Sequence, residues 1–141
     1  MCGIAGIHGL EAFDGLANAT RGVRDMVSAI AHRGPDAEGF WSDEEHVVLG
    51  HRRLSILDTG EGANQPFLMG EDALVFNGEV YNYLELRREL EAAGAHRFST
   101  SGDTEVVLAA LRHWGLDGAI RRFNGMFAFA WWSASERRLA L

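Results

Sequence analysis

Cysteine is almost absent from this sequence, because only Cys2 among the 141 residues carries a thiol. A single cysteine cannot form an internal disulfide, which excludes the small secreted scaffolds that depend on such bonds. Basic residues are also few: 13 Lys and Arg stand against 20 Asp and Glu, giving a formal charge of −7. A nucleic-acid-binding module usually carries a basic patch, so we expect no nucleic-acid partner.

Long apolar runs are absent as well. The longest, residues 126–132, has the length of a strand, far short of the ~20 residues that cross a bilayer, so we expect no membrane partner. The chain begins without a basic stretch ahead of an apolar run, which is unlike a signal peptide. These absences predict a cytoplasmic protein. The length of 141 residues and the 47% of hydrophobic residues suit one domain with a core.

Hydrophobic spacing and turn residues predict helices and strands in alternation. Helices are expected at residues 17–31, at 83–93 with Asn82 and Glu85 forming a capping box, and from Asp103 or Thr104 to Gly115. Strands are expected at residues 4–7, 38–41, 46–57, 73–76 and 126–132, and the start of another at 137–141. Short turns between several strands favour an α+β fold, with helices packed on a mainly antiparallel sheet.

Cys2 is a candidate nucleophile because of its position. A thiol attacks as the thiolate, and an ordinary cysteine has a pKa of about 8.5, so a base must take its proton. Removal of Met1 would free the α-amino group of Cys2, whose pKa of about 7.7–8.0 suits it to be that base. A buried, unreactive cysteine is the alternative, and Cys2 taken alone favours it.

The Asn77-Gly78 pair is a candidate oxyanion hole. Attack on an amide creates an oxyanion, which the Asn77 side-chain NH₂ and the backbone N–H of Gly78 can bind together. The same dipeptide is the strongest short signal for a hairpin turn, and in isolation the turn is the better interpretation.

Two arginines and one aspartate supply candidate charges. Arg52 and Arg53 lie within an apolar strand pattern, so one of them faces inward or lies at a strand end. An inward guanidinium can bind a substrate carboxylate, and a structural salt bridge explains the pattern equally well. Asp103 is by default a helix N-cap, and alternatively the partner of a substrate ammonium group. With Cys2 and the oxyanion pocket, these charges indicate an amidase for the side-chain amide of an amino acid.

Several short segments carry these residues in a fixed order. They are residues 1–6 (MCGIAG), 32–36 (HRGPD), 50–56 (GHRRLSI), 65–66 (QP), 76–82 (FNGEVYN), 101–105 (SGDTE) and 125–130 (GMFAFA). In this order the chain resembles the class II glutamine amidotransferases, which are N-terminal-nucleophile hydrolases, and within them the asparagine synthetase family.

The resemblance implies a role for each site residue. Cys2 would attack the carboxamide of glutamine, form a γ-glutamyl thioester and release ammonia, while its α-amino group carries the proton. Asn77 and the Gly78 N–H would form the oxyanion hole. Arg53 would bind the α-carboxylate of glutamine, and Glu79 and Asp103 its α-amino end. The substrate-binding residues implied in this way are Arg53, Leu54, Ile56, Asn77, Gly78, Glu79 and Asp103. No metal and no cofactor are implied for this step.

The resemblance also implies an αββα sandwich of two antiparallel sheets between helix layers. Residues 1–141 would form a partial type 2 glutamine amidotransferase domain, incomplete at its C-terminus. The ATP-using synthetase domain would be absent, because no Ser-Gly-Gly-x-Asp-Ser pyrophosphate loop occurs here. That domain, normally in the same chain, would use ATP and magnesium to activate aspartate, and the full-length protein could be a homodimer.

Two alternatives stay open. The first is an amidotransferase of the same family with a different acceptor, since the acceptor is chosen outside this chain. The second is an inactive, truncated module that binds glutamine or another protein.

Overall fold

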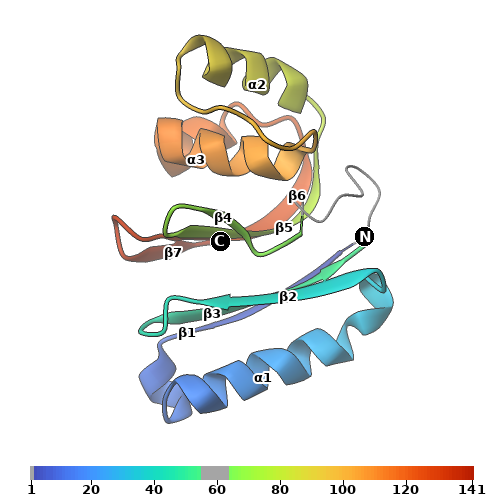
Figure 1. The fold of residues 1–141 in the computed structure, drawn as a ribbon, viewed down its shortest axis with the longest axis vertical. Helices are drawn as coiled ribbons and strands as arrows, with labels where there is room; N and C mark the ends of the chain where they lie inside the picture. The colour runs from blue at the N-terminus through green and yellow to red at the C-terminus, as the bar shows by residue number, and fades with distance from the viewer. Residues whose placement is uncertain (1, 55–63) are drawn as a thin grey trace.

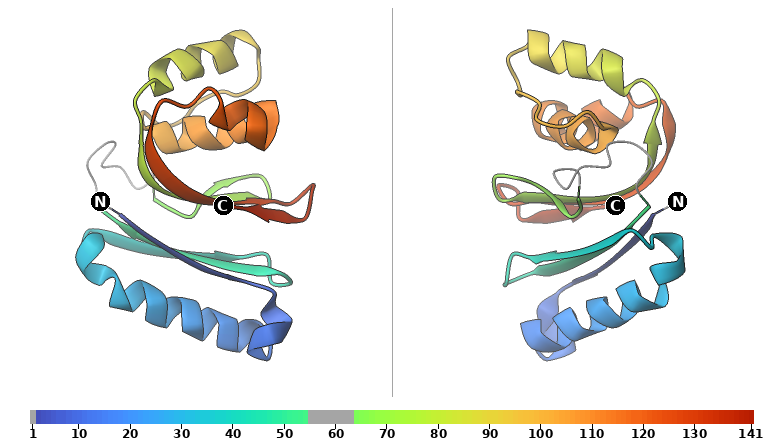
Figure 2. Two further views of the ribbon diagram at one scale, coloured as in Figure 1. Left: turned by 180° about the vertical axis from the view of Figure 1, so that it is seen from behind. Right: turned by 45° about the vertical axis from the view of Figure 1, so that its right-hand side comes forward.

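The computed structural model describes residues 2–54 and 64–141. Two antiparallel sheets face each other, with helix α1 on the outer face of one and helices α3 and α2 beyond the outer face of the other (Figure 1). The views in Figure 2 show the same layers from behind and after a turn of 45°. The expected α+β sandwich of αββα type is therefore confirmed.

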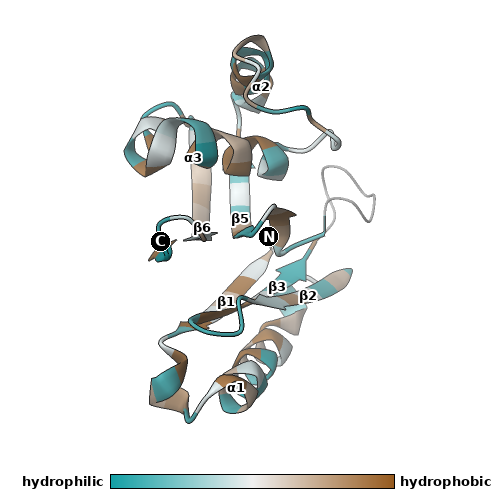
Figure 3. Ribbon diagram, turned by 60° about the vertical axis from the view of Figure 1, so that its left-hand side comes forward, coloured by the Kyte–Doolittle hydropathy of each residue, from teal (hydrophilic) through white to brown (hydrophobic). Residues whose placement is uncertain are grey.

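The first sheet has the strand order β1-β3-β2 and is covered by α1. Its strands are β1 (Gly3–His8), β2 (Ala37–Ser42) and β3 (Val47–Arg53), and α1 spans Leu16–Ala29. The helix buries Ala19, Val23 and Val27, which recur every four residues along one face. Figure 3 shows polar and apolar residues alternating along this helix. Short 3₁₀ turns, η1 (Leu10–Phe13) and η2 (Ala31–Arg33), lie before and after α1.

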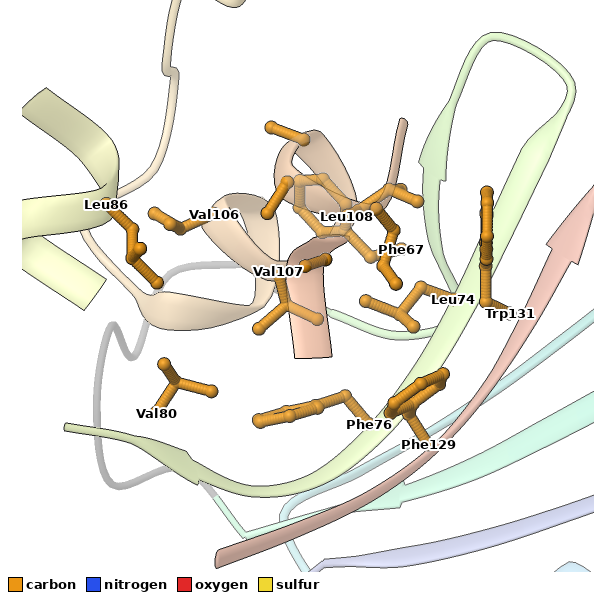
Figure 4. Close-up of a cluster of buried hydrophobic side chains, with 14 of the residues drawn as sticks. Phe67, Leu74, Phe76, Val80, Leu86, Val106, Val107, Leu108, Phe129 and Trp131 are labelled. Atoms are coloured by element: carbon orange, nitrogen blue, oxygen red, sulfur yellow. The ribbon is translucent and has the colours of Figure 1, made fainter. Parts of the chain in front are cut away.

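The second sheet has the strand order β4-β5-β6-β7. Its strands are β4 (Phe67–Met69), β5 (Asp72–Val80), β6 (Gly125–Ser133) and β7 (Arg138–Ala140). Helix α3 (Asp103–Ile120) covers its outer face, and α2 (Tyr83–Ala92) packs on α3. Figure 4 shows side chains of β5, β6 and α3 meeting in this core, among them Phe76, Val107 and Phe129.

A separate apolar layer joins the two sheets. It consists of Val47, Leu49, Ala73, Val75, Ala130 and Trp132. These residues come from β3 in one sheet and from β5 and β6 in the other, so strands β5 and β6 are covered on both faces. That double burial explains the nearly uninterrupted apolar sequence of β6, as expected for a strand between two cores.

Most predicted elements are found within a few residues of their expected bounds. The prediction of a strand over residues 46–57 holds as far as Arg53, and residues 55–57 lie outside the described residues. Strand β4 was not predicted; it pairs with β5 across a turn at Gly70, whose φ is 66°. No helix in residues 2–54 and 64–141 is long and apolar enough to cross a membrane.

Two of the three local predictions at helix ends are wrong. Asn82 precedes α2 but makes no capping bond with its side chain, because that amide instead bonds the Arg122 carbonyl and the Asn124 N–H. The residue at the N-cap of α3 is Gly102, and Asp103 lies in the first turn. The predicted end at Gly115 is confirmed: its φ of 71° and ψ of 174° are not helical, so the first helical segment of α3 stops there, and a second short segment follows to Ile120.

Candidate active site

Cys2 lies at the junction of β1 and β3. These strands pair antiparallel with Gly3 opposite Arg52, so the register continued by one residue sets Cys2 opposite Arg53. The Leu54 N–H points at the Cys2 Sγ with an N···S distance of 3.4 Å, and the Sγ lies 3.7 Å from the Leu54 carbonyl oxygen. The thiol is only partly buried. A backbone N–H aimed at sulfur is a donor suited to a thiolate.

Arg33 and its neighbours hold this junction from the other side. The Arg33 Nε donates to the Cys2 carbonyl oxygen at 3.0 Å. A side chain at Gly34 would collide with the backbone of Arg52, so the glycine permits the chain to lie against β3. The Asp36 N–H donates to the Arg53 carbonyl at 3.0 Å. The HRGPD segment therefore fixes the backbone of both Cys2 and Arg53, a role that sequence reasoning had not given to Arg33.

The two neighbouring arginines have different surroundings. Arg52 pairs with Glu38 at 3.0 Å and donates its Nε to the Val27 carbonyl at 3.2 Å, which makes it a structural residue. Arg53 is 6% exposed, lines the same cavity as Cys2, and donates to the Asn64 Oδ1 at 2.6 Å. The salt-bridge interpretation therefore holds for Arg52, while Arg53 is the buried arginine that lines the cavity.

Asn77 and Gly78 do not form a hairpin turn, which corrects the prediction made for the pair in isolation. Both lie inside β5 and pair with Ala128 and Phe127 of β6. Gly78 has φ 151°, and a Cβ there would collide with the Met126 carbonyl oxygen of β6. The close approach of the two strands at this position therefore requires glycine. The Asn77 Oδ1 is the buried atom of its amide and has no hydrogen-bond partner among the described residues. Asn77 itself lines the cavity.

Asp103 joins the end of β5 to the start of α3. Its Oδ2 accepts the Val80 N–H at 3.0 Å, and the carboxylate belongs to the first turn of the helix, after the N-cap Gly102. Burial raises the pKa of Asp103. The hydrogen bond from Val80 lowers that pKa, and the negative charge of nearby Glu79 raises it further. Asp103 is 6% exposed and Glu79 is exposed, so the cavity has a buried and an open carboxylate on one wall.

Glu105 organises the loop that precedes α3. Its carboxylate accepts the N–H and hydroxyl groups of Ser99 and Thr100 over 2.7–3.1 Å and bonds the His96 Nε2 at 2.8 Å. Burial alone raises the pKa of Glu105, but the bonds from His96, Thr100 and Ser99 outweigh it and lower the pKa to about 2. Glu105 thereby positions Thr100, which lines the cavity.

One cavity of about 310 Å³ brings the candidate residues together. This volume lies at the small end of the range of roughly 300–1,000 Å³ seen for ligand pockets. Of the residues named from the sequence, the cavity is lined by Cys2, Arg53, Leu54, Asn77, Gly78, Glu79 and Asp103. Ile56 lies outside the described residues. The sequence predicted no role in binding or catalysis for the other lining residues, which are Gln65, Phe67, Phe76, Tyr81, Thr100, Gly102, Thr104 and Met126.

The fold and this cavity define the class of protein. Residues 1–141 match the family described as glutamine amidotransferase domain, so the chain belongs to that family. Within it, the chain matches the glutamine-hydrolysing part of asparagine synthetases. It is 43% identical over 141 residues to glutamine-hydrolysing asparagine synthetase 1 of Bacillus subtilis (strain 168), a match that covers 99% of this chain and 22% of the relative.

Two further proteins are similar to this chain, one in sequence and one in structure. The chain is 43% identical over 113 residues to Amidase chry2 of Gibberella zeae, a match that covers 78% of this chain and 16% of that relative. Among solved structures, the glutamine phosphoribosylpyrophosphate amidotransferase of B. subtilis superposes with a TM-score of 0.68 at 22% identity, over 92% of this chain and 34% of that one. At that identity the likeness shows the fold alone. The chain thus spans about a fifth of the length of these curated relatives.

Proposed function

We propose that this chain hydrolyses the side-chain amide of glutamine, with Cys2 as the nucleophile. The observation that supports this most strongly is one small cavity lined by a thiol, an Asn-Gly pair, a buried arginine and a buried aspartate. A free amino acid with a terminal amide has three complementary groups: a carboxamide, an α-carboxylate and an α-ammonium group.

The reaction has two halves. The Cys2 thiolate attacks the carboxamide carbon, and the oxyanion that forms is stabilised by the Asn77 Nδ2 and the Gly78 N–H. The C–N bond then breaks, the nitrogen takes a proton from the α-ammonium group of Cys2, and ammonia leaves a γ-glutamyl thioester. Water adds to the thioester with the α-amine as base, and glutamate and the thiol are released. Removal of Met1 is a condition of this mechanism.

Recognition of the substrate uses groups of opposite charge that line the same cavity. Arg53, held beside Cys2 by the Leu54 and Asp36 contacts, binds the α-carboxylate. Asp103 and Glu79 bind the α-ammonium group, and Leu54 contacts the substrate beside Arg53. We extend the same role to Ile56 on the basis of the sequence motif alone.

The activity of the whole protein is also part of this proposal. Because relatives that match 99% of this chain at 43% and 37% identity are named glutamine-hydrolysing asparagine synthetases, we propose that the ammonia amidates an ATP-activated aspartate in a further domain. The hydrolytic step itself would use no cofactor and no metal, whereas that domain would use ATP and magnesium. We further propose a cytoplasmic location, where a catalytic thiol stays reduced, and a homodimer for the full-length protein. The similarity to Amidase chry2 favours a second candidate, the same hydrolysis serving a different acceptor.

The test is glutamine hydrolysis by the intact protein and by Cys2→Ala. Wild type is expected to release glutamate and ammonia, and Cys2→Ala to fall to the background rate while ammonia-dependent synthesis in the full-length protein persists. Hydrolysis that survives in Cys2→Ala would show the assignment to be wrong. A wild type that binds glutamine without hydrolysing it, and that retains Met1, would instead identify an inactive binding module.

A further inference from the structure

We propose that His51 and Gln65 are positioning residues for the oxyanion hole, because together they hold both peptide groups of Phe76, the residue immediately before Asn77. This inference rests on the proposed hydrolysis of glutamine. Neither residue carries a charge that the proposed chemistry needs, and only Gln65 reaches the cavity wall. Their effect on the reaction therefore passes through the backbone of β5.

The two contacts are specific. The Phe76 N–H donates to the Gln65 Oε1 at 2.6 Å, and the His51 Nε2 donates to the Phe76 carbonyl oxygen at 3.2 Å. His51 is fully buried and Gln65 is 8% exposed. His51 belongs to β3 in the opposite sheet, so its bond ties the strand that carries Arg53 to the strand that carries Asn77.

The need for these side chains follows from the sheet topology. Strand β4 pairs with β5 only from Asp72 to Leu74, so beyond Leu74 no strand of residues 2–54 and 64–141 pairs with the outer edge of β5. A buried peptide group without a partner costs about 1–3 kcal/mol. At Phe76 the missing strand is replaced by an acceptor from Gln65 and a donor from His51.

The alternation of an antiparallel strand links this edge to the oxyanion hole. In such a strand the N–H and C=O of one residue point to the same side, and residues two apart share that side. The Phe76 groups point to the outer edge, and the Val80 N–H at the same edge is bound by Asp103. Gly78 lies midway between them. Its N–H is therefore aimed into the cavity between two fixed points of the backbone.

The ionisation state of His51 agrees with this role. A carbonyl oxygen accepts only from a protonated Nε2, and the Nδ1 is buried with no partner among the described residues. The pKa of His51 is lowered to about 4, mainly by burial. The hydrogen bond to Phe76 raises the pKa, and the positive charge of Arg53 lowers it. At neutral pH His51 is thus a neutral imidazole that donates one hydrogen bond, with no proton to give to the reaction.

Gln65 is itself held tightly in place. A side chain at Gly39 of β2 would collide with the Gln65 carbonyl oxygen, so this stretch of chain lies directly on the first sheet. The preceding residue, Asn64, accepts a hydrogen bond from Arg53 at 2.6 Å. Gln65 therefore fixes Phe76 relative to the first sheet, and His51 of β3 does the same through its own hydrogen bond.

The experiment compares the intact wild-type protein with His51→Leu, His51→Gln and Gln65→Met. The matched control is His113→Leu, because His113 is exposed on α3. Displacement of a catalytic group by about 1 Å can lower a rate ~10²-fold. We expect His51→Leu and Gln65→Met to lose on the order of 10- to 100-fold in kcat, with KM for glutamine within about threefold of wild type. His51→Gln, whose amide N–H replaces the Nε2 donor, should recover most of the loss.

A second measurement separates positioning from a general loss of structure. An aldehyde analogue of glutamine forms a tetrahedral adduct with the thiol and places its oxygen in the oxyanion hole, whereas glutamate does not. The affinity for the aldehyde should fall by the same factor as kcat/KM, with the affinity for glutamate unchanged.

The inference is overturned if His51→Gln is as impaired as His51→Leu. It is also overturned if His51→Leu and Gln65→Met bind the aldehyde as tightly as wild type. If His51→Leu fails to fold, Gln65→Met and His51→Gln decide the matter. Absence of glutamine hydrolysis in the wild type, by contrast, would refute the proposed function itself and with it this inference.

Discussion

The backbone nitrogen of Leu54 lies 3.4 Å from the Sγ of Cys2 and directly follows Arg53 in the chain. The same few atoms at the ends of β1 and β3 therefore set both the nucleophile and the guanidinium proposed to bind the substrate carboxylate. The oxyanion donors come from the other sheet, on β5. The cavity thus depends on how the two sheets stack, and the His51 bond to Phe76 is one direct link between them.

Substitution of Arg53 should mainly weaken substrate binding. Arg53→Gln removes the charge that we propose pairs with the α-carboxylate of glutamine, and truncating one partner of a desolvated charge pair costs about 2–5 kcal/mol. We expect kcat/KM for glutamine to fall on the order of 10²-fold, mostly through KM. Steady-state kinetics of glutamate release measure this.

Arg52→Gln is the matched control for that prediction. Arg52 pairs with the half-exposed Glu38, an interaction worth about 1 kcal/mol or less. KM for glutamine should stay within about twofold of wild type. Equal rises in KM for the two variants would show that the strand end, and not the charge of Arg53, determines binding.

Gly78→Ala should impair both stability and hydrolysis. The added methyl meets the backbone carbonyl of Met126, and φ 151° is a conformation that alanine rarely adopts. Overpacking of this kind costs about 1–3 kcal/mol and would displace the Gly78 N–H. Gly70→Ala is the control, because Gly70 also has positive φ but a Cβ there meets nothing within 4 Å. Urea unfolding and kcat should show stability lost in both variants and activity lost only in Gly78→Ala.

Elements with a regular hydrophobic pattern were predictable from the sequence. Helix α1, with Val23 and Val27 at helical spacing, and the apolar strand β6 both appear where they were expected. The position of Arg53 and Asp103 in one cavity with Cys2 also agrees with the sequence hypothesis. These features follow from local periodicity and from segments whose order along the chain is distinctive.

The wrong predictions share a physical cause, since each concerns a polar group that finds a distant partner. Asn77-Gly78 suits a local turn, but pairing with β6 makes it part of a strand. Asp103 suits an N-cap, but the unpaired edge of β5 offers it the Val80 N–H. Gln65 carried no local signal of function, because its partner Phe76 is 11 residues away. Such long-range bonds depend on the sheet topology, which spacing along the sequence does not reveal.

The free energy of unfolding should decrease as the pH is lowered from 6.5 to 4, because folded His51 stays neutral in this range. Above pH 6.5 neither the folded nor the unfolded chain is charged at this residue. Below it the unfolded histidine binds a proton that folded His51, with its pKa of about 4, does not bind. The unfolded state therefore binds more protons, and stability falls by about 3 kcal/mol in total between pH 6.5 and 4. Chemical unfolding across this range should show a flatter profile in His51→Gln, while His113→Gln keeps the wild-type slope.

Glu105 should contribute stability in a lower pH range. Its folded pKa of about 2 lies below the ordinary value of 4.5, so its contribution is complete above pH 4.5 and is lost as pH falls toward 2. Glu105→Gln keeps the shape but not the charge, and at pH 7 we expect it to lose about 2–3 kcal/mol of unfolding free energy. Glu85→Gln, at an exposed position on α2, should change stability by less than about 0.5 kcal/mol. Thermal unfolding that is equally unchanged in both variants would contradict the role given to Glu105.

In the proposed mechanism the amine and the thiol of one residue, Cys2, carry out the hydrolysis. Intact-protein mass spectrometry on the protein mixed with glutamine and quenched in acid within the first turnover tests it most directly. We expect a chain without Met1 that carries one added γ-glutamyl group, which fragmentation locates on Cys2. An active protein that retains Met1, or that hydrolyses glutamine with the acyl group on another residue, would contradict it.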